Sequence, residues 1–428
     1  MKLKFIKSIT ANPVFKVSSL NALSVLVKIA GGLISSKIIA IFIGPSGLAL
    51  VGNFRNFIRQ AEVFSMLGFE NGIIKYIAEN QKNKTEQYKV ISTVFFSVLA
   101  AVLLVGILIL LFAAELNKVF FGNNSNYVWI FRVMVFALPM YAGNLVFIGV
   151  LNGMSRYKDV IKINVAGNIA GVIISGILIW QFAVSGALLG LLVSPSLLFF
   201  LTFYLLTKRT GGIKYLRLSN FSKPVFKGLL SFSAMSLVTA LISPLVTISI
   251  RTQIMLDYSS DEAGLWEAVN RISFFYFMFV STLLTVYFFP KLSSSNTDKE
   301  TNAVFKSYYT TIIPVFAFGL LMIYFLRYFI ILLLFNDDFL PMEKLFSWQL
   351  LGDFFKACSL ILGYEFFAKK MTKQFILAEL FSLGILYFSS THLISHYGSE
   401  GAVMGHAVTY FIYLIVLVAV FRKKIFTK

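Results

Sequence analysis

The sequence predicts an all-α integral membrane protein of about twelve transmembrane helices in two six-helix lobes. Three observations support this fold class. The composition is 58% hydrophobic and only 13% charged, whereas soluble domains carry roughly 25% charged residues. Apolar runs long enough to cross a bilayer core of about 30 Å recur along all 428 residues. The basic residues, which give a formal charge of +19, gather in every second loop between these runs.

Each predicted span is a continuous apolar run of about twenty residues, which at a rise of about 1.5 Å per residue crosses the hydrocarbon core. Strands of a membrane barrel would be about ten residues long with alternating hydrophobicity, a pattern that these runs lack. Helices are therefore expected, because in lipid every backbone polar group must be paired internally. The predicted spans are 17–43, 46–69, 89–113, 127–151, 160–181, 184–207, 225–250, 263–289, 307–334, 344–367, 374–391 and 400–421.

Lysine and arginine predict the orientation, because they are enriched in short cytoplasmic loops. One set of flanks is strongly basic, and it includes Lys2, Lys4 and Lys7, the loop over 208–227, and Arg422, Lys423, Lys424 and Lys428. The alternate flanks hold only Lys118, Arg251, Arg327 and Lys344. Both termini are therefore predicted to be cytoplasmic. A nucleic-acid partner is not expected, since it would need a basic face on a soluble fold.

The two halves of the chain resemble each other in sequence. Two short matches support this. In the first, Gly47-Leu48 with Asn53 matches Gly264-Leu265 with Asn270. In the second, Gly186-Ala187 with Gly190 matches Gly401-Ala402 with Gly405. The nearly constant offsets predict an internal duplication, with an N-terminal six-helix lobe over 1–215 and a C-terminal six-helix lobe over 216–428. Parallel repeats of this kind typically hold a substrate site near the midplane between the halves. Two bundles that merely pack together are the alternative.

Ionisable residues inside the spans are functional candidates, because a charge at the bilayer centre costs a few kcal/mol or more. At about 1.5 Å per residue, Lys28 is expected roughly 16 Å below the membrane surface at which the first span begins. Arg55 is expected roughly 14 Å below the opposite surface, at which the second span begins. Arg55, Arg59 and Glu62 follow at spacings of four and three, which places them on one helical face. Lys28, Arg55 and Arg59 are predicted to contact substrate, with Glu62 partly neutralising the arginines.

The second half contributes two charged pairs at helical spacing, Glu267 with Arg271 and Asp353 with Lys356. Each pair has two interpretations, an ion pair that only fixes packing or a part of the transport site. The interior cations outnumber the interior acids, and this balance suits an anionic head group. We therefore predict Arg271 and Lys356 as further substrate-binding residues, and Glu62, Glu267 and Asp353 as charge-pair or coupling candidates.

Other chemistry is weakly represented. A single cysteine, Cys358, rules out disulfides and paired-cysteine zinc sites. No P-loop, HExxH or GxSxG motif is present, so no cofactor, metal ligand or catalytic residue is predicted and the chain is expected to be a transporter rather than an enzyme. His392, His396 and His406 are predicted to cluster near the eleventh and twelfth spans on the outer side, with a proton-sensing role the less favoured interpretation.

Several short motifs recur in a characteristic order and spacing along nearly the whole chain. They are Leu26-Val27-Lys28-Ile29, Gly44-Pro45, Asn53-Phe54-Arg55, Asn71-Gly72 with Lys75-Tyr76, Gly186-Ala187-Leu188-Leu189-Gly190, Asp261-Glu262 with Trp266, Trp348-Gln349-Leu350 with Gly352-Asp353, and Ile376-Leu377-Ala378-Glu379. In these motifs the sequence resembles the Wzx-type flippases for O-antigen and enterobacterial common antigen precursors, within the multidrug/oligosaccharidyl-lipid/polysaccharide (MOP) superfamily. Within this family the sequence most resembles the lipid III branch.

This resemblance implies a V-shaped fold like that of the multidrug and toxin extruders, with a cationic cavity that opens alternately to each side. It implies transport of an undecaprenyl-pyrophosphate-linked oligosaccharide across the bacterial inner membrane, from the cytoplasmic to the periplasmic leaflet. Membrane lipids, a glycan polymerase and a chain-length regulator are the other partners that the family suggests. The identity of the sugar does not transfer, because head groups vary within the family.

Three alternative functions differ in what they require. A cation-coupled drug exporter of the same superfamily would favour an anionic, aromatic cavity, against the cationic balance here. A membrane glycan polymerase or ligase would need a large outer loop with catalytic residues, whereas the outer loops here are short. A scaffold without transport activity would not need Lys28 and Arg55 near the middle of the membrane.

Overall fold

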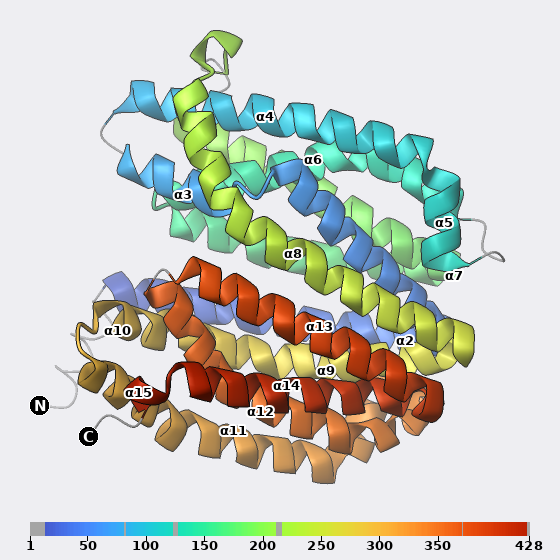
Figure 1. Ribbon diagram of the computed structural model, residues 1–428. Helices are drawn as coiled ribbons and strands as arrows, with labels where there is room; N and C mark the ends of the chain where they lie inside the picture. The colour runs from blue at the N-terminus through green and yellow to red at the C-terminus, as the bar shows by residue number, and fades with distance from the viewer. Residues whose placement is uncertain (1–12, 81–82, 123–126, 211–215, 370, 426–428) are drawn as a thin grey trace, which may run out of the picture. The chain divides into compact units, whose positions relative to one another are not determined.

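The computed structural model is helical throughout its described part, which comprises residues 13–80, 83–122, 127–210, 216–369 and 371–425 (Figure 1). Within these described residues, eight helices are long and apolar enough to cross a membrane. The N-terminal Lys2, Lys4 and Lys7 and the C-terminal Lys428, which contribute to the predicted orientation, lie outside the described residues. An all-α, multi-pass membrane protein is therefore confirmed.

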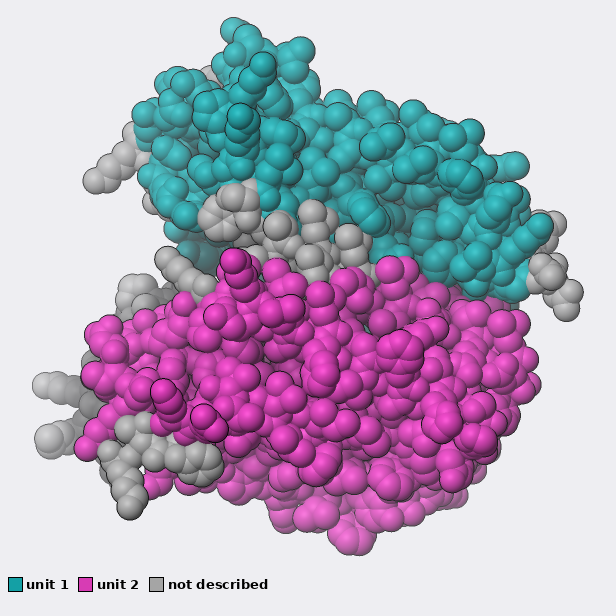
Figure 2. Space-filling view, in the orientation of Figure 1, with its two compact units in different colours: residues 1–38, 54–240 teal, residues 39–53, 241–428 magenta. Residues whose placement is uncertain are grey.

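The chain folds into two compact units, coloured separately in Figure 2. Unit 1 contains residues 1–38 and 54–240, and unit 2 contains residues 39–53 and 241–428. The division into lobes at residues 215 and 216 stays a prediction, and residues 211–215 beside it lie outside the described residues.

The central helix of unit 1 is α6, which contacts α3, α4, α5 and α7. Its elements are α3 (Glu70–Glu79), α4 (Lys84–Leu111), α5 (Ala113–Phe121), α6 (Val128–Gly153), α7 (Tyr157–Thr210) and η2 (Leu218–Asn220), with parts of α2 (Pro13–Met66) and α8 (Lys223–Asp257). Buried phenylalanines from α2, α5 and α6 pack together in its core, for example Phe54, Phe121 and Phe131.

Unit 2 is centred on α12 and α14, which lie side by side and also contact α11, α13 and α9 (Figure 1). Its elements are α9 (Ser260–Leu283), η3 (Leu284–Phe288), α10 (Phe289–Ser294), α11 (Asp298–Leu334), η4 (Asp337–Leu345), α12 (Phe346–Ala368), α13 (Thr372–Tyr397), α14 (Ser399–Val420) and α15 (Arg422–Ile425), with the remainder of α2 and α8. Its apolar core draws on α9 to α14.

Local sequence signals set where several helices begin. Asn83, Ser259 and Thr297 each precede a helix, and each side chain accepts a hydrogen bond from the backbone N–H of a glutamate three residues later. This spacing is that of the capping box, in which the side chain satisfies a backbone donor that has no partner within the helix. These caps fix the starts of α4, α9 and α11, and each helix begins before its predicted span, α11 by the most (Asp298 against 307).

Two of the longest helices are each interrupted by one non-helical residue, so that each provides two spans. The interruption in α2 lies at Gly44 (φ 65°, ψ −169°), and that in α7 lies at Ala183 (φ 47°, ψ −124°). Both breaks fall between predicted spans, 17–43 and 46–69 in the first case and 160–181 and 184–207 in the second. Counted this way, the eight helices cover ten of the predicted spans, and α8 and α9 lie over the other two, 225–250 and 263–289.

Backbone geometry repeats between the halves at a separation of 215 residues. Ala183 in α7 corresponds to Gly398 before α14, and both have a positive φ with a strongly negative ψ (47°, −124° and 60°, −138°). A Cβ added at Gly186 would clash with the carbonyl of Leu178, and one at Gly401 would clash with the carbonyl of Leu393. These paired positions are what an internal duplication requires.

We expect Ala183→Gly to stabilise the protein by about 1 kcal/mol, because the φ and ψ at this position are favoured only by glycine. The reciprocal change Gly398→Ala should destabilise it by more, since a Cβ there would also lie 3.2 Å from the Tyr258 ring. The control is Gly384→Ala, at a helical position with no atom within 4 Å of the added Cβ. Thermal unfolding of the purified protein in detergent measures all three, and equal midpoints for Ala183→Gly and wild type would contradict the expectation.

Candidate functional site

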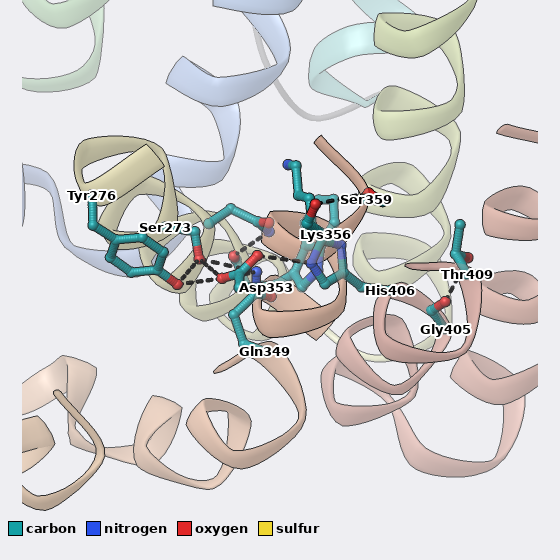
Figure 3. A network of polar contacts seen from close by, with 11 residues as sticks. Ser273, Tyr276, Gln349, Asp353, Lys356, Ser359, Gly405, His406 and Thr409 are labelled. Atoms are coloured by element: carbon teal, nitrogen blue, oxygen red, sulfur yellow. Dashed lines mark hydrogen bonds and ion pairs between the residues drawn. The ribbon is translucent and has the colours of Figure 1, made fainter. Parts of the chain in front are cut away.

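A polar cluster in unit 2 is centred on Asp353, which is fully buried in α12. Its Oδ2 accepts hydrogen bonds from Ser273 Oγ at 2.5 Å, from the Tyr276 hydroxyl, and from Gln349 Nε2 at 3.2 Å (Figure 3). Its Oδ1 lies 2.9 Å from Nε2 of His406. Donors from α9, α12 and α14 thus converge on one carboxylate, which meets the requirement that a buried charge be hydrogen-bonded.

Lys356 lies one helical turn after Asp353 and extends the cluster. The two side chains attract each other electrostatically, as predicted from their spacing. The Lys356 ammonium also lies 4.7 Å from the ring centroid of Phe277 and 5.1 Å from that of Tyr410. Both rings are within the range of a cation–π interaction. Lys356 thus lies within a larger network than the sequence suggested, and the role of the Asp353–Lys356 pair in transport stays a prediction.

A second network in unit 2 surrounds Arg251, whose side chain is only 2% exposed. One of its guanidinium nitrogens forms an ion pair with Glu267 in α9, and another donates a hydrogen bond of 2.8 Å to Asn53 Oδ1 in α2. The guanidinium also lies 5.4 Å from the ring of Trp266. Arg271 is in the electrostatic field of both Glu267 and Arg251. Glu267 therefore pairs directly with Arg251 and also attracts Arg271 electrostatically.

The structure corrects two sequence predictions. Arg251 was expected in an outer loop, whereas α8 continues to Asp257 and buries it. His392 and His396 were expected beyond the end of a span, whereas α13 continues to Tyr397. His406, which the predicted span 400–421 contains, lies on α14 and contacts Asp353. Sequence reasoning missed the partners of Arg251 and His406 because each partner lies in another helix. The helical spacing of Asp353 and Lys356 was the local signal for this cluster in the sequence.

The predicted residues of unit 1 lie along α2. Lys28 and Arg59 are both exposed side chains, and they are close enough for their charges to repel each other. Glu62 interacts with Arg59, accepts a hydrogen bond from Tyr141 in α6, and is repelled by Glu70. Arg55 is half-buried on the same helix. The structure therefore groups Lys28, Arg59 and Glu62 in unit 1, while their role in binding stays a prediction.

Comparison with known proteins identifies the family. The sequence model described as polysaccharide biosynthesis protein matches residues 15–296. The chain is 32% identical over 416 residues to the lipid III flippase of Escherichia coli (strain K12), covering 95% of this chain and 97% of that protein. The chain belongs to the polysaccharide biosynthesis protein family. The lipid III flippase of Shigella flexneri is similar to the same extent.

Solved structures show that this family member shares a transporter fold. A multidrug resistance MATE family transporter of the MOP superfamily, in an inward-facing conformation, superposes with a TM-score of 0.78 at 16% identity and covers 94% of each chain. The lipid II flippase MurJ, in an inward closed conformation, gives a TM-score of 0.70 at 17% identity over 96% of this chain and 89% of that one. The predicted membrane-transporter fold is thereby confirmed.

We expect Arg251→Met to lower the free energy of unfolding by roughly 3–5 kcal/mol, because it leaves the Glu267 carboxylate buried without its ion-pair partner. The double variant Arg251→Met/Glu267→Leu should lose less than the sum of the single variants, since no unpaired charge remains. Arg327→Met is the matched control. It breaks a more exposed ion pair with Glu343 and should cost less than about 1 kcal/mol. Similar unfolding midpoints for Arg251→Met and Arg327→Met in detergent would contradict this assignment.

Proposed function

We propose that this chain is a flippase that moves a polyprenyl-pyrophosphate-linked oligosaccharide from the cytoplasmic to the periplasmic leaflet of the bacterial inner membrane. The observation that carries the proposal is the end-to-end similarity to lipid III flippases, at 32% identity over 95% of the chain. An O-antigen or enterobacterial common antigen type of glycan is the expected cargo. A glycan polymerase and a chain-length regulator are proposed as partners in the same membrane.

The physics of the cargo supports this function. A pyrophosphate cannot enter hydrocarbon unaided, because an unpaired ion in a medium of low dielectric constant is very costly. Cations within the spans would replace its hydration, while the polyprenyl tail stays in the lipid. We propose that Lys28, Arg55 and Arg59 supply this charge from unit 1, and that Arg271 and Lys356 supply it from unit 2. Alternating access would then carry the shielded head group between the two leaflets.

A cation-coupled exporter of small molecules is the second candidate, because the multidrug transporter superposes with a TM-score of 0.78. That likeness is at 16% identity, half of the identity to the lipid III flippases, and it concerns the fold alone. The cationic residues on α2 also favour an anionic cargo over the cationic compounds that a drug exporter typically removes. The flippase assignment is therefore preferred.

We expect the double variant Lys28→Ala/Arg55→Ala to abolish glycan translocation while the protein still inserts into the membrane, because the pyrophosphate loses its counter-charges. Lys162→Ala is the matched control, an exposed lysine near the start of α7. The measurement is surface glycan in a deletion strain complemented at native expression, together with mass spectrometry of the lipid-linked glycan that accumulates. Normal glycan levels in the double variant would remove these residues from the binding site.

We also propose that both termini are cytoplasmic. Replacing Cys358, the single cysteine, with serine gives a cysteine-free background for testing this. Lys373 and His396 are exposed near opposite ends of α13. In intact spheroplasts, a membrane-impermeant maleimide should label His396→Cys but not Lys373→Cys, and detergent should expose both. Labelling of Lys373→Cys alone before solubilisation would reverse the orientation.

A further inference from the structure

The Asp353–His406 pair combines two titratable groups within membrane-spanning helices. Asp353 follows the start of α12 by seven residues, and His406 follows the start of α14 by seven. At 1.5 Å per residue each group lies roughly 10 Å along its helix. Ionisable residues at such positions are rare and mark ion or proton pathways by default, including relays of aspartate and histidine. The pair therefore calls for a role beyond holding α12 against α14.

The close approach of the two helices is built into the backbone. Gly352 lies directly before Asp353, and a Cβ added there would clash with the His406 ring and with the backbone of Ala407. The absence of a side chain at Gly352 thus brings the imidazole against α12. In the N-terminal half, the position 215 residues earlier is Leu191. Histidine is therefore not needed for the helix packing that the two halves share.

The charges around the pair favour the uptake of one proton. The facing charged groups are Lys356 on α12, which interacts with Asp353, and Glu379 on α13, which interacts with Lys356. The facing tyrosines are Tyr276, Tyr410 and Tyr413. When His406 is neutral, the carboxylates of Asp353 and Glu379 and the ammonium of Lys356 give a net formal charge of −1. One added proton brings this described cluster to neutrality, which is favourable in a medium of low dielectric constant.

A metal cation fits this place poorly. Both oxygens of Asp353 already face donors, namely Ser273, Tyr276 and Gln349 on one side and His406 on the other. A cation would have to displace these donors, and the Lys356 ammonium would repel it. A proton needs neither change, because an imidazole ring nitrogen can bind it while the hydrogen bond to Asp353 persists.

We propose that Asp353 and His406 form a proton-binding site that takes up and releases one proton in each transport cycle, an inference that rests on the proposed function. A proton from water binds Nδ1 of the neutral His406 ring, while the Nε2–H continues to donate to Asp353 Oδ1. The resulting imidazolium–carboxylate pair adds Coulomb attraction between α14 and α12, and release of the proton to water removes it. Protonation thereby favours one packing of α12 against α14 over another. Coupling of proton binding to transport requires such an element with two states, whose balance the proton shifts.

The first experiment measures protonation without transport. The chain has three histidines, so His392→Gln/His396→Gln leaves His406 as the single imidazole signal in NMR spectra of ¹⁵N-histidine-labelled protein in nanodiscs. We expect this signal to report the binding of one proton in a single step as the pH is lowered. Adding Asp353→Asn should move the midpoint of this step, because it removes the charge that faces the imidazole. A signal that does not titrate, or a midpoint that Asp353→Asn leaves in place, would overturn the proposal.

The second experiment measures coupling in proteoliposomes with a fluorescent undecaprenyl-pyrophosphate-linked disaccharide and a pH-sensitive dye. In wild type, and in the His392→Gln/His396→Gln control, an imposed pH gradient should change the flipping rate severalfold. In His406→Gln and Asp353→Asn the ratio of rates with and without the gradient should fall to about one. Variants that flip with an unchanged gradient response would overturn the proton site alone. Wild-type protein that never moves the probe would reject the proposed function, while the titration still decides the proton site.

Discussion

The cost of placing charge in hydrocarbon is the constraint on which the rest of this structure depends. A lone charged side chain at the bilayer centre is expensive, so each one must be paired, hydrogen-bonded or open to water. Unit 2 meets this constraint internally, because Asp353 collects four donors and Glu267 holds the buried guanidinium of Arg251. In unit 1, by contrast, Lys28 and Arg59 keep exposed side chains. The same constraint thus governs both the buried charge networks of unit 2 and the exposed cations of unit 1.

The duplication explains why two halves with similar backbones carry different chemistry. The repeated features are steric, namely the break at Ala183 and Gly398 and the close contacts of Gly186 and Gly401. Steric features persist because helices that touch through backbone atoms tolerate no added side chain. His406 falls outside this shared set, since Leu191 stands at the equivalent position. The two halves therefore differ in polar chemistry at a position where their helical geometry is similar.

Much of the fold could be predicted because the bilayer imposes strong local rules. Span length and apolarity identified the helices, and the breaks at Gly44 and Ala183 fell where one span was expected to end and the next to begin. The site was less predictable. The sequence selected the correct helices and the acids Glu267 and Asp353, but it missed Arg251 and His406. Local periodicity pairs residues three or four positions apart, and those two residues find their partners across helices.

The sequence by itself determined that this is a multi-pass helical membrane protein, because the composition and the length of its apolar runs permit no soluble fold. It also determined the excess of cations within the spans, since charge is a property of residue type alone. Only the tertiary structure decided which charges are neutralised, because pairing depends on which helix faces which. Asp353 meets His406 through the close packing of α12 against α14, a proximity that their separation of more than fifty residues does not reveal.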